Sequence, residues 1–138
     1  MTHGGCLRGE GPDRAALEAQ TRELGIADAV AMPGFEANPF RFMARARLFV
    51  LSSRREGSPN VLVQALACGC PVVATDCPSG PREILALAGC GRLVGVGEVE
   101  ALAEAMLAAL DEPRPATLDL GEFHYLTSAA RYLAAAGA

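Results

Sequence analysis

Apolar residues follow two patterns that alternate along the chain. Short continuous apolar runs predict strands covered on both faces, and apolar residues three or four positions apart predict helices. The strands are expected at residues 29–32, 48–51, 71–75 and 92–96. The helices are expected at residues 13–24, 39–46, 61–68, from 81 onward, at 98–110 and at 123–136.

Turn-forming and capping residues mark where several of these helices begin and end. Gly25 and Gly69 each follow an apolar-periodic run, as the left-handed C-terminal residue of a helix does. Asn38 and Pro39 supply an N-cap and a first-turn proline. Glu83 is expected to cap the amino end of its own helix, because a carboxylate there also complements the helix dipole.

Strands that alternate with helices at this spacing indicate an α/β fold. Such connections produce a mainly parallel sheet with helices on both faces, so we expect a Rossmann-like three-layer α/β/α architecture in one domain, residues 1–138. Ligands bind these sheets beyond the carboxyl ends of the strands. Two loops follow a strand and open a helix there, at residues 52–60 and 76–80.

The composition narrows the possible functions. The 138 residues are 51% hydrophobic, which is enough for one core. All 12 basic residues are arginine, so a phosphate-binding lysine and Schiff-base chemistry are excluded. A net charge of −4, scattered arginines and 5% aromatic residues offer little to duplex or single-stranded nucleic acid. We therefore expect no nucleic-acid partner.

The sequence carries no pattern typical of export or of a membrane span. No uninterrupted apolar stretch approaches the ~18 residues that a span needs. The five cysteines are an odd number, which indicates reduced thiols rather than a disulfide framework. The predicted strand 71–75 separates Cys68 and Cys70 from Cys77 and Cys90, so we expect no metal site. These observations favour a cytoplasmic protein without metal or cofactor.

The loop before the helix at 61–68 contains the candidate chemistry. Glu56 and Gly57 precede the amino end of a buried helix, where backbone N–H groups and the positive end of the dipole attract anions. This arrangement favours a phosphate-binding site. The residues themselves also fit a surface carboxylate, a turn glycine and, at Asn60, a helix cap.

A longer run extends this pattern. The segment SSRREGSPNVLVQALACGCPVVATDCPSGPREIL, residues 52–85, contains E-G-x-P-N-V-L, A-C-G-x-P-V-V and G-P-R-E-I. It closely resembles the nucleotide-sugar-binding lobe of the group 1 glycosyltransferases, which are retaining, metal-independent enzymes of the GT-B fold. The resemblance covers about residues 7–135. It implies that the chain is an incomplete C-terminal, donor-binding lobe of such an enzyme.

The resemblance also implies roles for individual residues. Glu56 would lie against the donor sugar as the catalytic residue. The implied substrate-binding residues are Gly57, Ser58, Pro59, Asn60, Val61, Leu62, Gln64 and Phe35. The first four would meet the sugar and diphosphate through their backbone, and Val61 and Leu62 would lie near the nucleoside. Phe35 matches a position near the nucleobase, although a buried loop aromatic fits this position equally well.

Gln64 departs from the family pattern. The family has a second glutamate here, eight positions after the first, which accepts hydrogen bonds from both ribose hydroxyls. An amide has one acceptor oxygen and no charge, which costs about 1–2 kcal/mol of binding free energy. We expect nucleotide binding to be weakened but retained.

Two family features are missing from the chain. It has no amino-terminal acceptor lobe, and no preceding strand and helix with the Arg and Lys that neutralise the leaving diphosphate. Losing such partners raises a barrier by several kcal/mol, so we expect the isolated chain not to transfer sugar. Arg8 and two glycines stand where the lobe usually has an apolar strand, which suggests a truncated or wrongly started reading frame.

The favoured function is therefore donor binding within a glycosyltransferase that uses a UDP-, GDP- or ADP-sugar. The alternative is a non-catalytic module that binds a nucleotide or nucleotide sugar and docks onto a separately encoded acceptor lobe. A purely structural fragment is a third possibility. The sheet edge left by the missing unit is expected to bind a partner or to self-associate.

Overall fold

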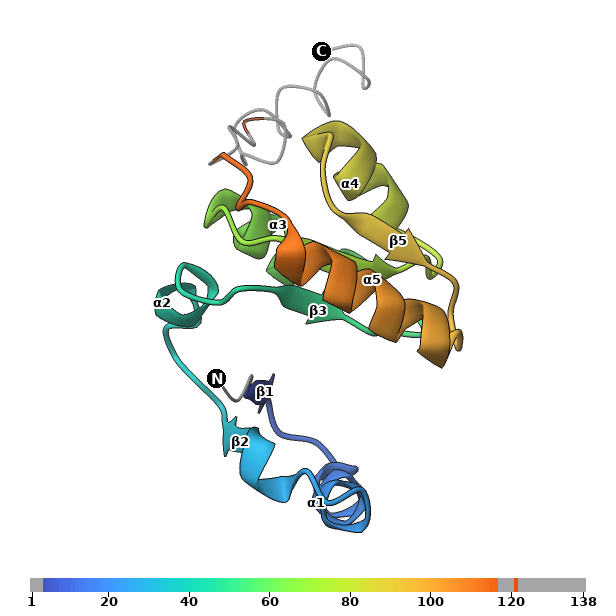
Figure 1. Cartoon of the computed structure of the whole chain (residues 1–138). Helices are drawn as coiled ribbons and strands as arrows, with labels where there is room; N and C mark the ends of the chain where they lie inside the picture. The colour runs from blue at the N-terminus through green and yellow to red at the C-terminus, as the bar shows by residue number, and fades with distance from the viewer. Residues whose placement is uncertain (1–3, 117–120, 122–138) are drawn as a thin grey trace. The chain divides into compact units, whose positions relative to one another are not determined.

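The computed structural model describes residues 4–116 and residue 121. The chain divides into two compact units, Met1–Pro39 and Phe40–Ala138 (Figure 1). The single domain expected from the sequence stays a prediction. The helix expected at residues 123–136 lies outside the described residues.

The first unit is a parallel strand pair joined by a helix. Its elements are β1 (Gly5–Arg8), α1 (Arg14–Glu23), the 3-10 helix η1 (Ala27–Ala29) and β2 (Val30–Gly34). Gly5 is opposite Val30 and Cys6 is opposite Ala31. Arg8 and a glycine stand in β1, so this strand is not continuously apolar, and its backbone pairing with β2 holds it in place. Gly25, with φ +67°, follows α1 as predicted.

The second unit contains a three-stranded parallel sheet in the order β3-β4-β5. Its elements are α2 (Phe40–Met43), β3 (Phe49–Leu51), α3 (Asn60–Ala67), β4 (Val72–Thr75), α4 (Pro81–Ala88), β5 (Arg92–Val94) and α5 (Val99–Asp111). The strands and helices predicted between residues 40 and 116 are all present, although α2 ends three residues and β5 two residues earlier than expected. The central strand β4 is buried along its whole length.

Helices cover both faces of this sheet, as Figure 1 shows. Val72 and Ala74 face α3 and α4 and join the larger core cluster, which includes Leu66. Val73 points to the opposite face and packs with Ala109 of α5. This alternation follows from the two-residue period of a strand. The second unit therefore has the predicted α/β/α layering, and the Rossmann-like α/β class is confirmed.

The Cys70 thiol gives this core a predicted pH dependence. Its side chain has no exposed surface, and its Sγ donates a hydrogen bond to the Ala46 carbonyl at 3.6 Å. Burial raises the pKa of Cys70, although the Arg114 guanidinium acts in the opposite direction. The unfolded chain therefore loses this proton at lower pH than the folded chain. We expect the free energy of unfolding to fall as the pH rises above about 9.

Urea unfolding at several pH values between about 7 and 10 measures this fall in the free energy of unfolding. A thiol titrates over roughly this range. The decline is expected to be smaller in Cys70→Ala than in the wild type. Cys6→Ala removes an exposed thiol and is the matched control, because it should keep the wild-type decline. Equal declines in all three proteins would show that Cys70 does not contribute.

Candidate functional site

The loop singled out in the sequence lies at the carboxyl edge of the sheet in the second unit. β3, β4 and β5 are parallel and end at Leu51, Thr75 and Val94. The segment 52–59 leads from β3 to α3, and the segment 76–80 leads from β4 to α4. Both loops therefore lie where parallel α/β sheets bind their ligands.

Pro59 and Gly80 bring these two loops into contact. A Cβ placed on Gly80 would lie 2.4 Å from Pro59 Cδ, so the loops leave no room for a side chain there. Gly80 also has a φ of +118°, which glycine adopts readily and other residues do not. The amino ends of α3 and α4 are consequently adjacent.

The two helix ends differ in how their backbone donors are used. In α4 the Glu83 carboxylate accepts a hydrogen bond from the Gly80 N–H at 3.0 Å, which confirms the predicted capping role of Glu83. In α3 no side chain caps the helix. Asn60 is the first residue of α3 rather than its cap, so the interpretation of Asn60 as a capping residue is wrong.

Several N–H groups at the amino end of α3 are available to a ligand. Within the part of the chain that the structure describes, no protein group accepts a hydrogen bond from the N–H of Gly57, Ser58 or Val61. The Asn60 N–H donates to the Ser58 carbonyl at 2.8 Å. Unpaired N–H groups and the positive end of the helix dipole together favour an anion.

Glu56 lies directly beside these donors. Its side chain is half-buried, and its Oε1 accepts a hydrogen bond from the Ser53 hydroxyl at 2.5 Å. The next residue, Gly57, is exposed, and a Cβ placed on it would meet no atom within 4 Å. The loop thus presents a fixed carboxylate next to open backbone.

The remaining predicted residues of α3 divide between surface and core. Gln64 follows Asn60 by one helical turn, about 6 Å along the axis, so both lie on one face. Val61 and Gln64 are half-buried and Asn60 is exposed. Leu62 has no exposed surface and its side chain belongs to the core, and its position near the nucleoside stays a prediction. Pro59 is also buried.

Phe35 lies in the first unit, just after β2. Its side chain is 82% exposed, so the interpretation of Phe35 as a buried loop aromatic is wrong. Its contact with a nucleobase stays a prediction.

The sequence did not predict two residues whose hydrogen bonds hold this loop. Ser53 contacts Glu56, and Thr75 at the end of β4 contacts the Ser53 carbonyl at 2.5 Å. The available indication was a pair of serines directly after a predicted strand, three positions before Glu56. Nothing in the pattern pointed to Thr75, because its contact depends on the folded sheet.

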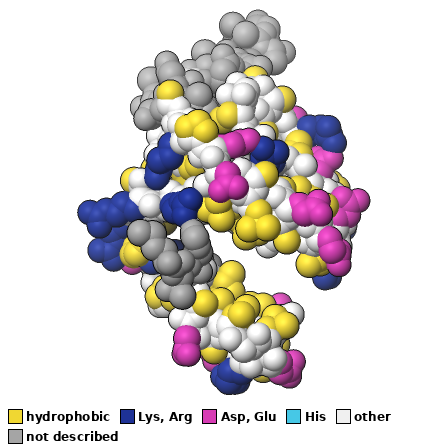
Figure 2. All heavy atoms as spheres, viewed as in Figure 1, with side chains coloured by type: hydrophobic (Ala, Val, Ile, Leu, Met, Phe, Trp, Pro, Cys, Tyr) yellow, Lys and Arg dark blue, Asp and Glu magenta, His cyan; other side chains and the backbone are white. Residues whose placement is uncertain are grey.

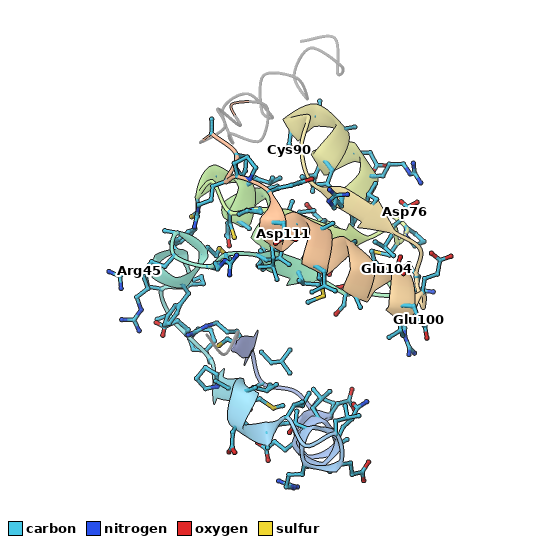
Figure 3. The ribbon with its side chains drawn as sticks, viewed as in Figure 1. Arg45, Asp76, Cys90, Glu100, Glu104 and Asp111 are labelled. Carbon is cyan, nitrogen blue, oxygen red and sulfur yellow. The ribbon has the colours of Figure 1, made fainter. Side chains whose placement is uncertain are left out.

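Charged groups of both signs occupy the second unit. Asp76, Glu100 and Glu104 lie toward the amino end of α5, and basic side chains gather around α2, where Arg45 lies (Figures 2 and 3). Arg82 forms an ion pair with Asp76. Arg54 and Arg55 directly precede Glu56, so their charge adds to the attraction that the backbone N–H groups of the loop have for an anion.

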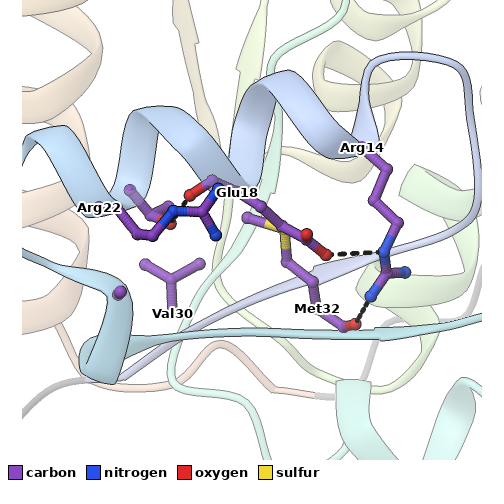
Figure 4. A pocket seen from close by; sticks show the side chains of 7 residues that line it. Arg14, Glu18, Arg22, Val30 and Met32 are labelled. Carbon is purple, nitrogen blue, oxygen red and sulfur yellow. Dashed lines mark hydrogen bonds and ion pairs between the residues drawn. The ribbon is translucent and has the colours of Figure 1, made fainter.

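Two cavities lie elsewhere. One, of about 290 Å³, lies in the first unit between α1 and β2 (Figure 4). There Arg14 donates to Glu18 at 2.9 Å and to the Met32 carbonyl at 2.5 Å, so its guanidinium holds α1 to β2. The other, of about 80 Å³, lies at the amino edge of β4 and β5 and includes Cys90. Residues 56–64 line neither cavity.

The described residues form neither a membrane-spanning helix nor a metal-binding cluster. No helix of residues 4–116 is both long and apolar enough to cross a bilayer. The same residues contain no group of three His, Cys, Asp or Glu side chains arranged to hold a metal ion. The five cysteines are not joined in disulfides.

The parallel sheet has helices on both faces and a loop at its carboxyl edge, where such sheets bind ligands, and these features define a Rossmann-like α/β protein. Residues 5–125 match the family described as "Glycosyl transferases group 1". The chain belongs to this family.

Relatives of known name agree with this assignment. An N-acetylgalactosamine-N,N'-diacetylbacillosaminyl-diphospho-undecaprenol 4-alpha-N-acetylgalactosaminyltransferase of Campylobacter jejuni is 36% identical over 108 residues, covering 78% of this chain and 30% of the relative. A lipopolysaccharide 1,6-galactosyltransferase of Salmonella typhimurium is 31% identical, covering 67% of this chain and 27% of the relative. The chain therefore spans less than a third of these two relatives.

Solved structures show the same fold. WaaG, a glycosyltransferase involved in lipopolysaccharide biosynthesis, is 28% identical with a TM-score of 0.69, covering 78% of this chain and 29% of WaaG. Anabaena Alr3699/HepE, crystallised in complex with UDP, is 29% identical with a TM-score of 0.67, covering 83% of this chain and 33% of that protein. Both neighbours are much longer than the part they share with this chain.

Proposed function

We propose that the chain is the donor-binding lobe of a group 1 glycosyltransferase and binds a nucleotide sugar at the loop 56–60. The observation that carries this proposal is the half-buried Glu56 carboxylate beside the N–H groups of Gly57, Ser58 and Val61, for which the described residues supply no acceptor. Family membership and the neighbour crystallised with UDP support it.

Each part of the loop suits one part of such a donor. The N–H groups of Gly57, Ser58 and Val61 bind the diphosphate without a metal ion, because the dipole of α3 adds positive potential there. Glu56 accepts hydrogen bonds from the sugar and stabilises positive charge that develops at the reacting carbon. Transfer proceeds with retention. Gln64, one turn further along α3, binds the ribose, and Val61 packs against the nucleoside.

Binding of the acceptor and stabilisation of the leaving diphosphate need groups outside the loop 56–60. Two relatives carry lipopolysaccharide or diphospho-undecaprenol in their names, so we propose a cell-surface glycan or its lipid-linked precursor as acceptor, bound by a separate lobe in the cytoplasm. The isolated chain binds donor without transferring sugar, because its sequence has no lysine and so offers no Arg–Lys pair to the leaving diphosphate. An edge strand of its sheet docks an acceptor-binding lobe or a second copy.

Calorimetric titration of the purified chain tests donor binding. The ligands are UDP, GDP and ADP, followed by the sugar ester of the best-bound nucleotide. We expect one nucleotide to bind in the micromolar to millimolar range and its sugar ester to bind more tightly. Absence of heat with every ligand at millimolar concentration would contradict the proposal.

A non-catalytic module would bind the same nucleotides in these titrations. Sugar transfer must therefore be assayed separately. The purified chain is therefore combined with separately produced acceptor-binding lobes. Transfer on adding such a lobe supports the enzyme, and donor binding without transfer in the assembled protein supports the module.

Gln64→Glu is expected to tighten nucleotide binding by about 5- to 30-fold, because a carboxylate accepts charge-assisted hydrogen bonds from both ribose hydroxyls. Titration with the best-bound nucleotide measures the change. The gain should disappear with the 2′,3′-dideoxy nucleotide.

Gln20→Glu is the matched control for this prediction. It makes the same chemical change at an exposed position of α1 and should leave the affinity unchanged. Unchanged or weaker binding by Gln64→Glu would contradict the ribose assignment.

A further inference from the structure

A hydroxyl group fixes the carboxylate on which the proposed function depends. Glu56 lies in a loop, where a glutamate side chain would ordinarily exchange between rotamers. Here its Oε1 accepts the Ser53 hydroxyl at 2.5 Å, a short distance typical of an O–H···O⁻ hydrogen bond. No other hydrogen bond to the Glu56 carboxylate occurs among the described residues. The second oxygen, Oε2, is thus available to a ligand.

Ser53 is in turn tied to the most buried strand of the unit. The Thr75 hydroxyl contacts the Ser53 carbonyl at 2.5 Å and the Leu51 carbonyl at 3.2 Å. Thr75 is 4% exposed and ends β4, in which every residue is buried. Hydrogen bonds therefore connect the sheet interior to the loop backbone, and the loop backbone to Glu56.

This connection has an energetic consequence for ligand binding. A carboxylate that is already held in one orientation loses less conformational entropy when a ligand binds. Because Ser53 occupies one oxygen, the other has a defined direction. The effect depends on the hydroxyl group of Ser53 and not on its volume. An alanine at this position would fill nearly the same space but would not orient Glu56.

We propose that Ser53 is the positioning residue for Glu56 in sugar recognition, anchored by Thr75. This inference rests on the proposed function, because it assigns Glu56 to the sugar part of the donor. If Ser53 has this role, removal of its hydroxyl weakens binding of the nucleotide sugar but leaves binding of the nucleotide nearly unchanged.

Ser53→Ala tests this selectivity. Affinity for the nucleotide sugar is expected to fall about 5- to 20-fold, and affinity for the corresponding nucleoside diphosphate by less than about twofold. The neighbouring Ser52 is exposed and contributes no hydrogen bond among the described residues, so Ser52→Ala is the matched control. An equal loss for both ligands, or no loss for either, would overturn the proposal.

A double-mutant cycle tests whether Ser53 acts through Glu56. In a Glu56→Gln background, Ser53→Ala should cause little further loss of nucleotide-sugar affinity, because the group it orients is already altered. Full additivity of the two effects would overturn the proposal.

Thr75 provides an independent pair of variants. Thr75→Val removes the buried hydroxyl and is expected to reduce nucleotide-sugar affinity in the same selective way. Thr75→Ser keeps the hydroxyl and should keep the affinity. Equal affinities of the two variants would contradict the anchoring role of Thr75.

A spectroscopic measurement separates this inference from the proposed function. The carboxyl ¹³C resonance of Glu56, assigned by its loss in Glu56→Gln, should shift in Ser53→Ala and not in Ser52→Ala, in the absence of any ligand. If the wild-type chain binds no nucleotide, the proposed function fails while this shift still reports the contact. An unchanged resonance in Ser53→Ala would overturn the positioning role itself.

Discussion

Glu56→Gln is expected to weaken nucleotide-sugar binding by about 10- to 100-fold. The amide keeps the size of the side chain but removes the negative charge and one acceptor oxygen. Binding of the nucleoside diphosphate should change little, because its phosphates meet the N–H groups of Gly57, Ser58 and Val61. Calorimetric titration with both ligands measures the two effects on one protein.

Glu104→Gln is the matched control for this prediction. Glu104 is exposed on α5, so this variant changes the net charge equally without touching the loop. The thermal midpoints of both variants should match the wild type. A loss of nucleotide-sugar affinity as large in Glu104→Gln as in Glu56→Gln would show that net charge, and not the loop carboxylate, governs binding.

Gly80→Ala is expected to lower the free energy of unfolding by about 2–4 kcal/mol. The added Cβ would lie 2.4 Å from Pro59 Cδ, and alanine rarely adopts a φ of +118°. Relief of this overlap must move Pro59, which precedes the amino end of α3. The variant should therefore also lose nucleotide affinity. Urea unfolding and calorimetric titration measure the two losses.

Gly89 offers a control for the backbone conformation itself. It follows α4 with a φ of +64°, and a Cβ placed on it would meet no atom within 4 Å. Gly89→Ala should cost about 1 kcal/mol, as expected for a left-handed residue without steric overlap, and should keep nucleotide affinity. Equal destabilisation by the two variants would show that the close contact between Pro59 and Gly80 does not add to the loss of unfolding free energy.

Local features of the fold could be predicted from the sequence because they depend on neighbouring residues. The left-handed Gly25 after α1 and the carboxylate of Glu83 at the start of α4 both act within one or two helical turns. The central strand β4 was predicted because a parallel strand buried on both faces is continuously apolar.

Features that depend on distant segments could not be predicted in this way. β1 has the sequence Gly-Cys-Leu-Arg, so only two of its four residues are apolar, and it forms through backbone pairing with β2. The helix α3 is apolar on nearly all sides, so the sequence pattern did not show that the side chain of Leu62 lies fully in the core. The hydrogen bond from the Thr75 hydroxyl to the Ser53 carbonyl joins residues 22 positions apart, and only the folded sheet brings them together.

The central claim is that backbone N–H groups at the amino end of α3 bind the phosphates of a nucleotide sugar. A ¹H–¹⁵N NMR titration with the best-bound nucleotide tests it most directly, because each N–H gives its own resonance. We predict the largest shifts at Gly57, Ser58 and Val61. Large shifts confined to other parts of the chain, with these three resonances unmoved, would contradict it.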